Sequence, residues 1–151
     1  MNADTPPSVG IVGLGNIGHY HADRLVELGA TLGGGLDIQP DARSRFGDKY
    51  GVDTYEEKEA MFEAVDAVII TTPNRFHEEY AVAALDAGLH VLLEKPLAHS
   101  LESAERIAAA AKDADGVCMV GFNNRFGNPV RVLKNYQDEG RFGDVHHVEA
   151  N

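Results

Sequence analysis

The chain has 151 residues, of which 44% are hydrophobic and 25% are charged, a composition typical of a soluble globular domain. Acidic residues outnumber basic ones by 24 to 13, and the net charge of −11 disfavours binding to nucleic acid or to an anionic membrane. No apolar run approaches the roughly 20 residues of a membrane-spanning helix, and the polar start lacks the pattern of a signal peptide. We therefore expect a cytoplasmic protein, and the carboxylate-rich surface is compatible with a halophilic source.

Cysteine and histidine usage gives no indication of a disulfide or a metal site. The one cysteine, Cys118, lies in the apolar run GVCMVGF, where a small core residue is expected. Two pairs of histidines are close in sequence, but the side chains of His19 and His21 would diverge on a helix. Those of His146 and His147 would point oppositely on a strand. We expect no bound metal.

Short apolar runs alternate with longer segments of helical period along most of the chain. The expected strands are residues 9–12, 31–36, 52–55, 67–70, 90–93 and 117–120, the second weakened by three glycines. The expected helices are about 16–28, 40–50, 56–62, 75–87, a segment after residue 100, and 129–137. This alternation predicts an α/β fold, a doubly wound parallel sheet of the Rossmann type with helices on both faces.

Local patterns refine these elements. In the first helix, one face carries Ile17, His21, Leu25 and Leu28. Asn74 and Ser100 are expected to cap the helices that follow them. Residues 1–143 are expected to form one domain, and residues 144–151 to begin a further strand.

The sequence GLGNIG, which starts at Gly13, matches a G-x-G-x-x-G pattern between the first strand and the first helix. Gly13 permits a tight turn, Gly15 lets a pyrophosphate approach the backbone, and Gly18 allows the helix to pack closely on the strand. Amides around Asn16 and Ile17, at the N-terminus of the helix, supply donors for phosphate oxygens. The pattern predicts a dinucleotide-binding turn.

Asp37 strengthens this prediction. It lies 19 residues beyond Gly18, at the end of the second strand, where a carboxylate accepts hydrogen bonds from an adenosine ribose. The alternative is an exposed turn residue. The order of strand, loop, helix and strand favours nucleotide binding.

Four stretches, VGIVGLGNIG, TTPNRFH, LLEKPLA and VGFNNRF, together resemble the N-terminal domain of the glucose–fructose oxidoreductase, inositol dehydrogenase and rhizopine catabolism (Gfo/Idh/MocA) family. The resemblance extends from Val9 to about Ala150, and the Glu-Lys-Pro element at 94–96 is its most specific part. It implies a Rossmann domain that binds NAD or NADP. It also implies hydride transfer between the nicotinamide and a sugar, polyol or related hydroxy compound. Because Asp37 would repel a 2′-phosphate, NADP is the less favoured cofactor.

The resemblance assigns further site residues. It implies that four residues after the strand at 67–70 flank the ribose and pyrophosphate, namely Thr72, Pro73, Asn74 and His77. It places Glu94 and Lys95 beside the nicotinamide and its ribose, and Asn123 near the ring. Lys95 is then the expected catalytic residue, whose cation favours the charge that develops on the substrate oxygen. The alternative for Glu94 and Lys95 is a solvated pair at a strand end, and a cis bond before Pro96 is plausible.

The resemblance further implies that residues 144–151 open a second α/β substrate domain, missing from this chain. In the family that domain supplies an Asp and a His in a D-x-x-x-H pattern and makes the homo-oligomer contacts. The one match in this chain, Asp86 to His90, is divided by Gly88 and is rejected. We therefore expect a chain that binds NAD but is catalytically incomplete by itself.

Two other functions fit the glycine turn. A non-catalytic, nucleotide-sensing Rossmann regulatory domain has a similar length, but it does not require Glu-Lys-Pro at 94–96 or GFNNRF at 121–126. A methyltransferase is disfavoured because helices continue regularly to the end of the chain, without an antiparallel hairpin. The oxidoreductase remains the favoured function.

Overall fold

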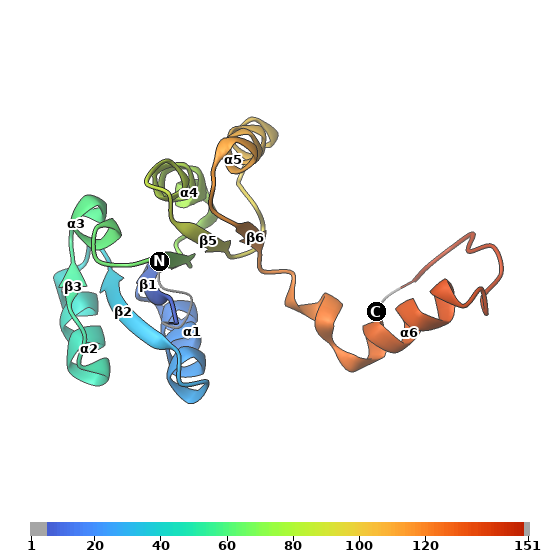
Figure 1. Cartoon of the computed structure of the whole chain (residues 1–151), viewed down its shortest axis with the longest axis horizontal. Helices are drawn as coiled ribbons and strands as arrows, with labels where there is room; N and C mark the ends of the chain where they lie inside the picture. The colour runs from blue at the N-terminus through green and yellow to red at the C-terminus, as the bar shows by residue number, and fades with distance from the viewer. Residues whose placement is uncertain (1–5, 150–151) are drawn as a thin grey trace. The chain divides into compact units, whose positions relative to one another are not determined.

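The computed structural model describes residues 6–149, which divide into two units after Gly121. The first unit contains β1 (Ser8–Val12), α1 (Asn16–Glu27), β2 (Thr31–Leu36), α2 (Pro40–Tyr50), β3 (Thr54–Tyr55), α3 (Lys58–Phe62), β4 (Ala67–Ile70), η1 (Asn74–Phe76), α4 (His77–Asp86), β5 (His90–Leu93), α5 (Leu101–Asp113) and β6 (Cys118–Val120) (Figure 1). The second contains η2 (Asn123–Phe126) and α6 (Asn128–Asp138). The α2, β2, β4 and β5 segments have the bounds expected from the sequence.

The strands form one parallel sheet in the order β3-β2-β1-β4-β5-β6. The chain moves outward from β1 through β2 to β3, and then returns to the other side of β1 with β4, β5 and β6. The order therefore reverses between β1 and β4, the point at which doubly wound sheets bind ligands. The predicted Rossmann-type α/β fold is confirmed.

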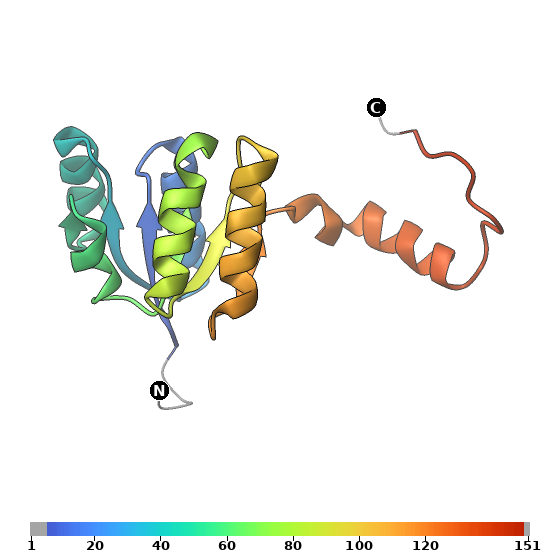
Figure 2. The ribbon, with the colours of Figure 1, turned by 90° about the horizontal axis from the view of Figure 1, so that it is seen from above.

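Successive strand residues point to opposite faces of the sheet and so enter two separate cores. Ile11 packs with α1 and α2, whereas Val12 packs in the core that α3, α4 and α5 cover. Figure 2 shows α4 and α5 side by side across one face of the sheet. Cys118 packs against the same core as Val12, and burial raises the pKa of its thiol.

The three glycines of β2 allow close packing rather than interrupting the strand. A Cβ on Gly33 would lie 2.0 Å from Ser8 Oγ, and a Cβ on Gly35 would lie 2.8 Å from the ring of Phe46. The register of β2 against β1 also shifts between Val9 and Gly10. The strand is complete because its neighbours occupy the space that side chains would fill.

The buried face of α1 differs from the expected apolar stripe. Gly18 and Ala22 are buried against the sheet, whereas Ile17 is 50% and Leu28 is 82% exposed. Small residues at these two positions let the helix approach the strands closely. Leu25 packs against the core as expected, whereas Ile17 and Leu28 do not lie on the buried face.

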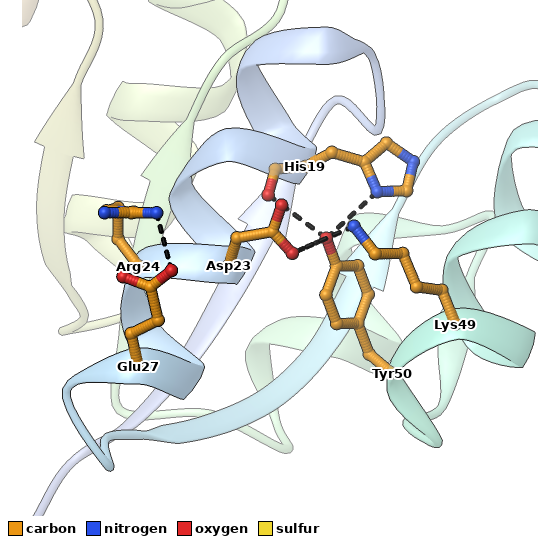
Figure 3. A network of polar contacts seen from close by, with 6 residues as sticks. All are labelled: His19, Asp23, Arg24, Glu27, Lys49 and Tyr50. Carbon is orange, nitrogen blue, oxygen red and sulfur yellow. Dashed lines mark hydrogen bonds and ion pairs between the residues drawn. The ribbon is translucent and has the colours of Figure 1, made fainter.

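A polar network holds α1 against α2 (Figure 3). The hydroxyl of Tyr50 donates to Asp23 Oδ1 at 2.9 Å, and Lys49 Nζ donates to the same oxygen at 2.9 Å. His19 Nδ1 lies 3.1 Å from the Tyr50 hydroxyl. Hydrogen bonds from Lys49 and Tyr50 lower the pKa of Asp23. The network lies over the aromatic residues of the core that α1 and α2 cover.

The helix that follows β4 and the helix that follows β5 are capped in different ways. Ser100 is the N-cap of α5 and its Oγ accepts from Ser103 N at 3.2 Å, as expected. Asn74 is not an N-cap, because it is the first residue of η1 and α4 begins only after Phe76. The short 3₁₀ turn displaces the start of the helix by about two residues.

The second unit contains an amphipathic helix and a following extended segment. Val130, Leu133 and Tyr136 of α6 are partly exposed, and Arg141 lies over the Tyr136 ring, 4.6 Å from its centroid. Residues 144–149 form no strand, which corrects the expectation for the described part of that segment. Among the described residues, the segment pairs with no strand. Residues 150 and 151, also expected in that strand, lie outside the described residues.

Two further kinds of feature, membrane-spanning helices and metal-binding clusters, can be assessed from the structure of residues 6–149. In this part of the chain no helix is long and apolar enough to cross a membrane. The same residues contain no group of three His, Cys, Asp or Glu side chains arranged to hold a metal ion.

An exposed ion pair joins α4 to α5. Arg106 Nη2 donates to Glu78 Oε2 at 2.8 Å, and Arg106 Nε donates to the other oxygen of the same carboxylate. The hydrogen bonds from Arg106 lower the pKa of Glu78 from 4.5 to about 2. A depressed carboxyl pKa contributes stability above the unfolded-state pKa, and that stability is lost as the pH falls towards the folded-state value.

We predict that Glu78→Gln lowers the free energy of unfolding at pH 7, and that its difference from the unmodified chain shrinks between pH 4.5 and about 2. Urea unfolding at several pH values measures this difference. Glu105→Gln, an exposed change on α5, is the control and is expected to show a smaller effect at pH 7. A difference for Glu78→Gln that stays constant through this pH range would contradict the prediction.

Candidate functional site

A cleft of about 740 Å³ lies at the carboxyl ends of β1, β2 and β4. Its size is within the range of small-molecule sites. Seven of the predicted site residues line it, contributed by the turn after β1, the end of β2 and the segment after β4: Gly13, Gly15, Asn16, Ile17, Asp37, Thr72 and Pro73. The fold thus brings together residues that are up to 60 positions apart in the sequence.

The three glycines of the turn have three different environments. Gly13 has φ +92°, and a Cβ there would lie 2.9 Å from Thr72 N. A Cβ on Gly18 would lie 2.2 Å from the carbonyl oxygen of Gly13, so this glycine permits the close contact between α1 and the turn. Gly15 is exposed, with nothing within 4 Å of a Cβ built on it. Only Gly15 therefore leaves space at the backbone for a ligand.

The N-terminus of α1 faces this turn. Gly15 is the N-cap, and Asn16 and Ile17 form the start of the helix and line the cleft. First-turn amides have no partner within their own helix, and the positive end of the helix dipole lies there. This part of the cleft is suited to bind an anionic group.

The Asp37 carboxylate is fixed at the end of β2. Its Oδ2 accepts from Leu14 N at 2.8 Å and its Oδ1 accepts from Gln39 N at 2.8 Å. The first bond ties the glycine turn to β2. The carboxylate is therefore held in one orientation on the wall of the cleft, where its remaining lone pairs can accept from hydroxyl groups.

The β4 end is tied to the same turn. Thr71 Oγ1 donates to the carbonyl oxygen of Gly13 at 2.6 Å. Thr72 Oγ1 is the one buried side-chain polar atom without a hydrogen-bond partner among the described residues. A buried hydroxyl without a partner costs roughly 1–3 kcal/mol. Thr72 is thus a candidate to bind a ligand group.

His77 joins two loops of the site. Its side chain is 1% exposed, with Nε2 2.9 Å from the carbonyl oxygen of Thr72 and Nδ1 3.0 Å from that of Pro96. The ring connects the segment after β4 to the Glu-Lys-Pro loop. His77 is the first residue of α4, and its direct contact with a cofactor stays a prediction.

The Glu-Lys-Pro loop begins where β5 ends. Glu94 Oε1 lies 2.9 Å from His21 Nε2 on α1, and Glu94 Oε2 accepts from Lys95 N at 3.1 Å. Lys95 is exposed, and the Lys95–Pro96 bond is cis. The Glu94 carboxylate is therefore oriented by α1, whereas the Lys95 side chain is exposed at the strand end.

Two asparagines complete the predicted set. Asn74 begins η1, directly after the cleft residue Pro73. Asn123 begins η2 in the second unit. The roles of both at a cofactor stay predictions.

The remaining lining residues were not among the predicted site residues, although three of them belong to the TTPNRFH stretch: Leu36, Ile38, Gln39, Thr71, Arg75, Phe76, Glu79 and Tyr80. Most of these lining residues are adjacent in sequence to predicted residues at the ends of β2 and β4. Glu79 and Tyr80 lie one helical turn further along α4. Proximity to a strand end is the sequence signal that could have found them. His21 has no such signal, because it contacts Glu94 only through the folded arrangement.

Comparison with known proteins shows to which family this chain belongs. The family model described as "Oxidoreductase family, NAD-binding Rossmann fold" (Gfo/Idh/MocA) matches residues 8–122. Myo-inositol 2-dehydrogenase of Thermotoga maritima is 33% identical over 91% of this chain and 42% of its own length. The chain thus spans about two fifths of that relative.

Two solved structures share the fold. Scyllo-inositol dehydrogenase from Lactobacillus casei, with bound NAD(H) and scyllo-inositol, has a TM-score of 0.86 and 31% identity over 93% of this chain and 43% of its own. An oxidoreductase described as NADPH-dependent, from Desulfitobacterium hafniense, has a TM-score of 0.87 and 30% identity over 93% of this chain and 42% of its own. On the family match and these similarities, the chain belongs to the Gfo/Idh/MocA oxidoreductase family, of which it contains the NAD-binding Rossmann fold.

Proposed function

We propose that the cleft binds NAD, and that the protein transfers a hydride between this cofactor and a sugar, polyol or related hydroxy compound. The observation that carries the proposal is the convergence of the glycine turn, Asp37 and the segment after β4 on one cleft. The dehydrogenase relatives and the NAD(H)-bound structure support it.

The residues present fit a dinucleotide. The pyrophosphate would lie over Gly15, where no side chain intervenes, and accept from the first amides of α1. The adenosine ribose would donate to Asp37, and Ile38 and Tyr80 offer apolar surface for the base. Thr72 Oγ1 would gain a partner.

The nicotinamide end is assigned to the Glu-Lys-Pro loop. When bound, NAD supplies the hydride acceptor. Lys95 would place its ammonium near the substrate oxygen and stabilise the negative charge that develops there. Glu94, held by His21, would accept from a ribose hydroxyl, and Asn123 would lie near the ring.

A non-catalytic, nucleotide-sensing domain remains the alternative function. It would use the same cleft. It would not require Lys95, however, nor the contact by which His21 of α1 holds the Glu94 carboxylate in place. The dehydrogenase names of the relatives also favour catalysis. The oxidoreductase is the function that we propose.

Several properties of the whole protein complete the proposal. We infer that residues 1–143 act as the dinucleotide-binding domain and that residues 144–151 begin a substrate domain, which would also make homo-oligomer contacts. The substrate is a small molecule, and the partners include neither nucleic acid nor a membrane. The single cysteine fits the reducing, cytoplasmic location that we infer. From the acidic composition we infer a halophilic source.

We predict that Gly15→Val leaves the chain folded but lowers NAD affinity by at least tenfold, because the new side chain would occupy space that the pyrophosphate needs. Gly18→Ala is the contrasting variant, in which the added Cβ meets the Gly13 carbonyl oxygen and the loss is in thermal stability. Calorimetric titration and thermal unfolding measure the two effects. Unchanged NAD binding by Gly15→Val would refute the pyrophosphate assignment.

We predict that NAD binds more tightly than NADP. The 2′-phosphate carries about −1.5 to −2 charges. At about 4 Å from Asp37 and an effective dielectric constant near 20, each charge costs roughly 4 kcal/mol before relaxation. Asp37→Ser should narrow the difference between the two dissociation constants. Equal or tighter NADP binding by the unmodified chain, measured by calorimetry, would refute this preference.

We also predict that the 151-residue chain binds NAD without turning over a polyol or sugar, because the proposed substrate pocket lies outside it. The assay follows NADH formation with a panel of inositols and sugars. Turnover at about 1 per second or faster would show that the substrate site lies within these residues.

A further inference from the structure

The guanidinium of Arg43 contacts the backbone of Asp37, the residue that faces the adenosine ribose in the proposed function. Arg43 is on α2, and its Nη1 donates to the carbonyl oxygen of Asp37 at 2.7 Å. Its side chain is 16% exposed. An arginine near this position is the group that accommodates a 2′-phosphate in Rossmann domains that bind NADP.

Glu56 occupies the other side of this guanidinium. It directly follows β3, and its Oε2 accepts from Arg43 Nη2 at 2.9 Å, while its side chain remains 65% exposed. One terminal nitrogen of Arg43 is thus bound to the Asp37 backbone and the other to Glu56. Arginine binds a phosphate with two parallel N–H donors, and in Arg43 these donors are already bound to two different protein acceptors.

The surroundings of the pair are acidic. A hollow of about 210 Å³, lined by Glu56, Glu57 and Glu79 among others, shares Ile38, Glu79 and Tyr80 with the cleft. Lys58, the cation in its lining, lies 3.4 Å from Glu79. A phosphate group that extends past Asp37 would therefore meet carboxylates and cations that already have partners.

We propose that Glu56 is a specificity-determining residue, which selects NAD over NADP by holding Arg43 away from a 2′-phosphate. The inference rests on the proposed function, in which the ribose lies at Asp37. Two layers of selection follow. The Asp37 carboxylate repels the phosphate directly, and the Arg43–Glu56 pair prevents the guanidinium that is bonded to the Asp37 carbonyl oxygen from compensating once that carboxylate is removed.

The test compares Asp37→Ser, Glu56→Gln and the double variant, with dissociation constants for NAD and NADP measured by calorimetry at low salt. Glu56→Gln alone should change NADP affinity by less than about threefold, because Asp37 still repels the phosphate. The double variant should bind NADP about tenfold more tightly than Asp37→Ser alone, as a charge-assisted contact forms. NAD affinity should be alike in Asp37→Ser and the double variant.

Two further variants keep the test specific. Glu63→Gln in the Asp37→Ser background removes the same charge from an exposed residue just after α3, and it should not reproduce the gain. Arg43→Gln added to the double variant should abolish the gain. Equal NADP affinity for Asp37→Ser and the double variant, or an equal gain with Glu63→Gln, would overturn the proposal. If the unmodified chain fails to bind NAD, the proposed function fails instead.

Discussion

The close contact of the turn after β1 with the ends of β2 and β4 is the constraint on which the site depends. The backbone of Gly13 passes so near Thr72 that no Cβ fits between them, and the Gly13 amide donates to the carbonyl oxygen of Leu36 at 2.8 Å. Asp37 and Thr71 add side-chain bonds to the same turn. Because three strands fix this turn, the first turn of α1 reaches the cleft in a defined orientation.

The distribution of charge is compatible with the proposed binding of an anionic cofactor to a strongly acidic chain. The net charge of −11 acts over the whole surface and is screened by salt, with a Debye length of about 8 Å at physiological ionic strength. The amides at the start of α1 act at contact distance. Acidic residues gather instead at the proposed adenosine end, where Asp37 and Glu79 line the cleft and Glu56 lies in the adjoining hollow. In the proposed function, the same chain would thus attract a pyrophosphate and repel a 2′-phosphate.

The strands, their parallel order and the glycine turn could be predicted from the sequence, because each depends on local apolar runs and on motif spacing. Contacts across the fold could not. His77 lies between two loops and His21 orients Glu94, 73 residues away, and neither pairing leaves a trace in periodicity. The face of α1 was misassigned because its packing depends on the small residues Gly18 and Ala22 rather than on large apolar ones.

Residue types alone also could not show which arginine lies beside Asp37, at the proposed ribose end of the cleft. Arg43 and Arg45 are similar in sequence, yet Arg43 is largely buried against Asp37 and Glu56, whereas Arg45 is exposed. The difference arises from the position of β3 beside β2, which brings Glu56 to α2. A strand of only two residues thereby determines the electrostatics at one end of the cleft.

The central claim is that a dinucleotide lies across the carboxyl ends of β1, β2 and β4. Backbone amide chemical shifts measured by NMR during an NAD titration of the 151-residue chain test it most directly. We expect saturable changes that are largest at residues 13–17, 37–39 and 71–76, with little change along α5. Changes centred instead on the α4–α5 surface around Val82 and Arg106, or no saturable change at all, would contradict it.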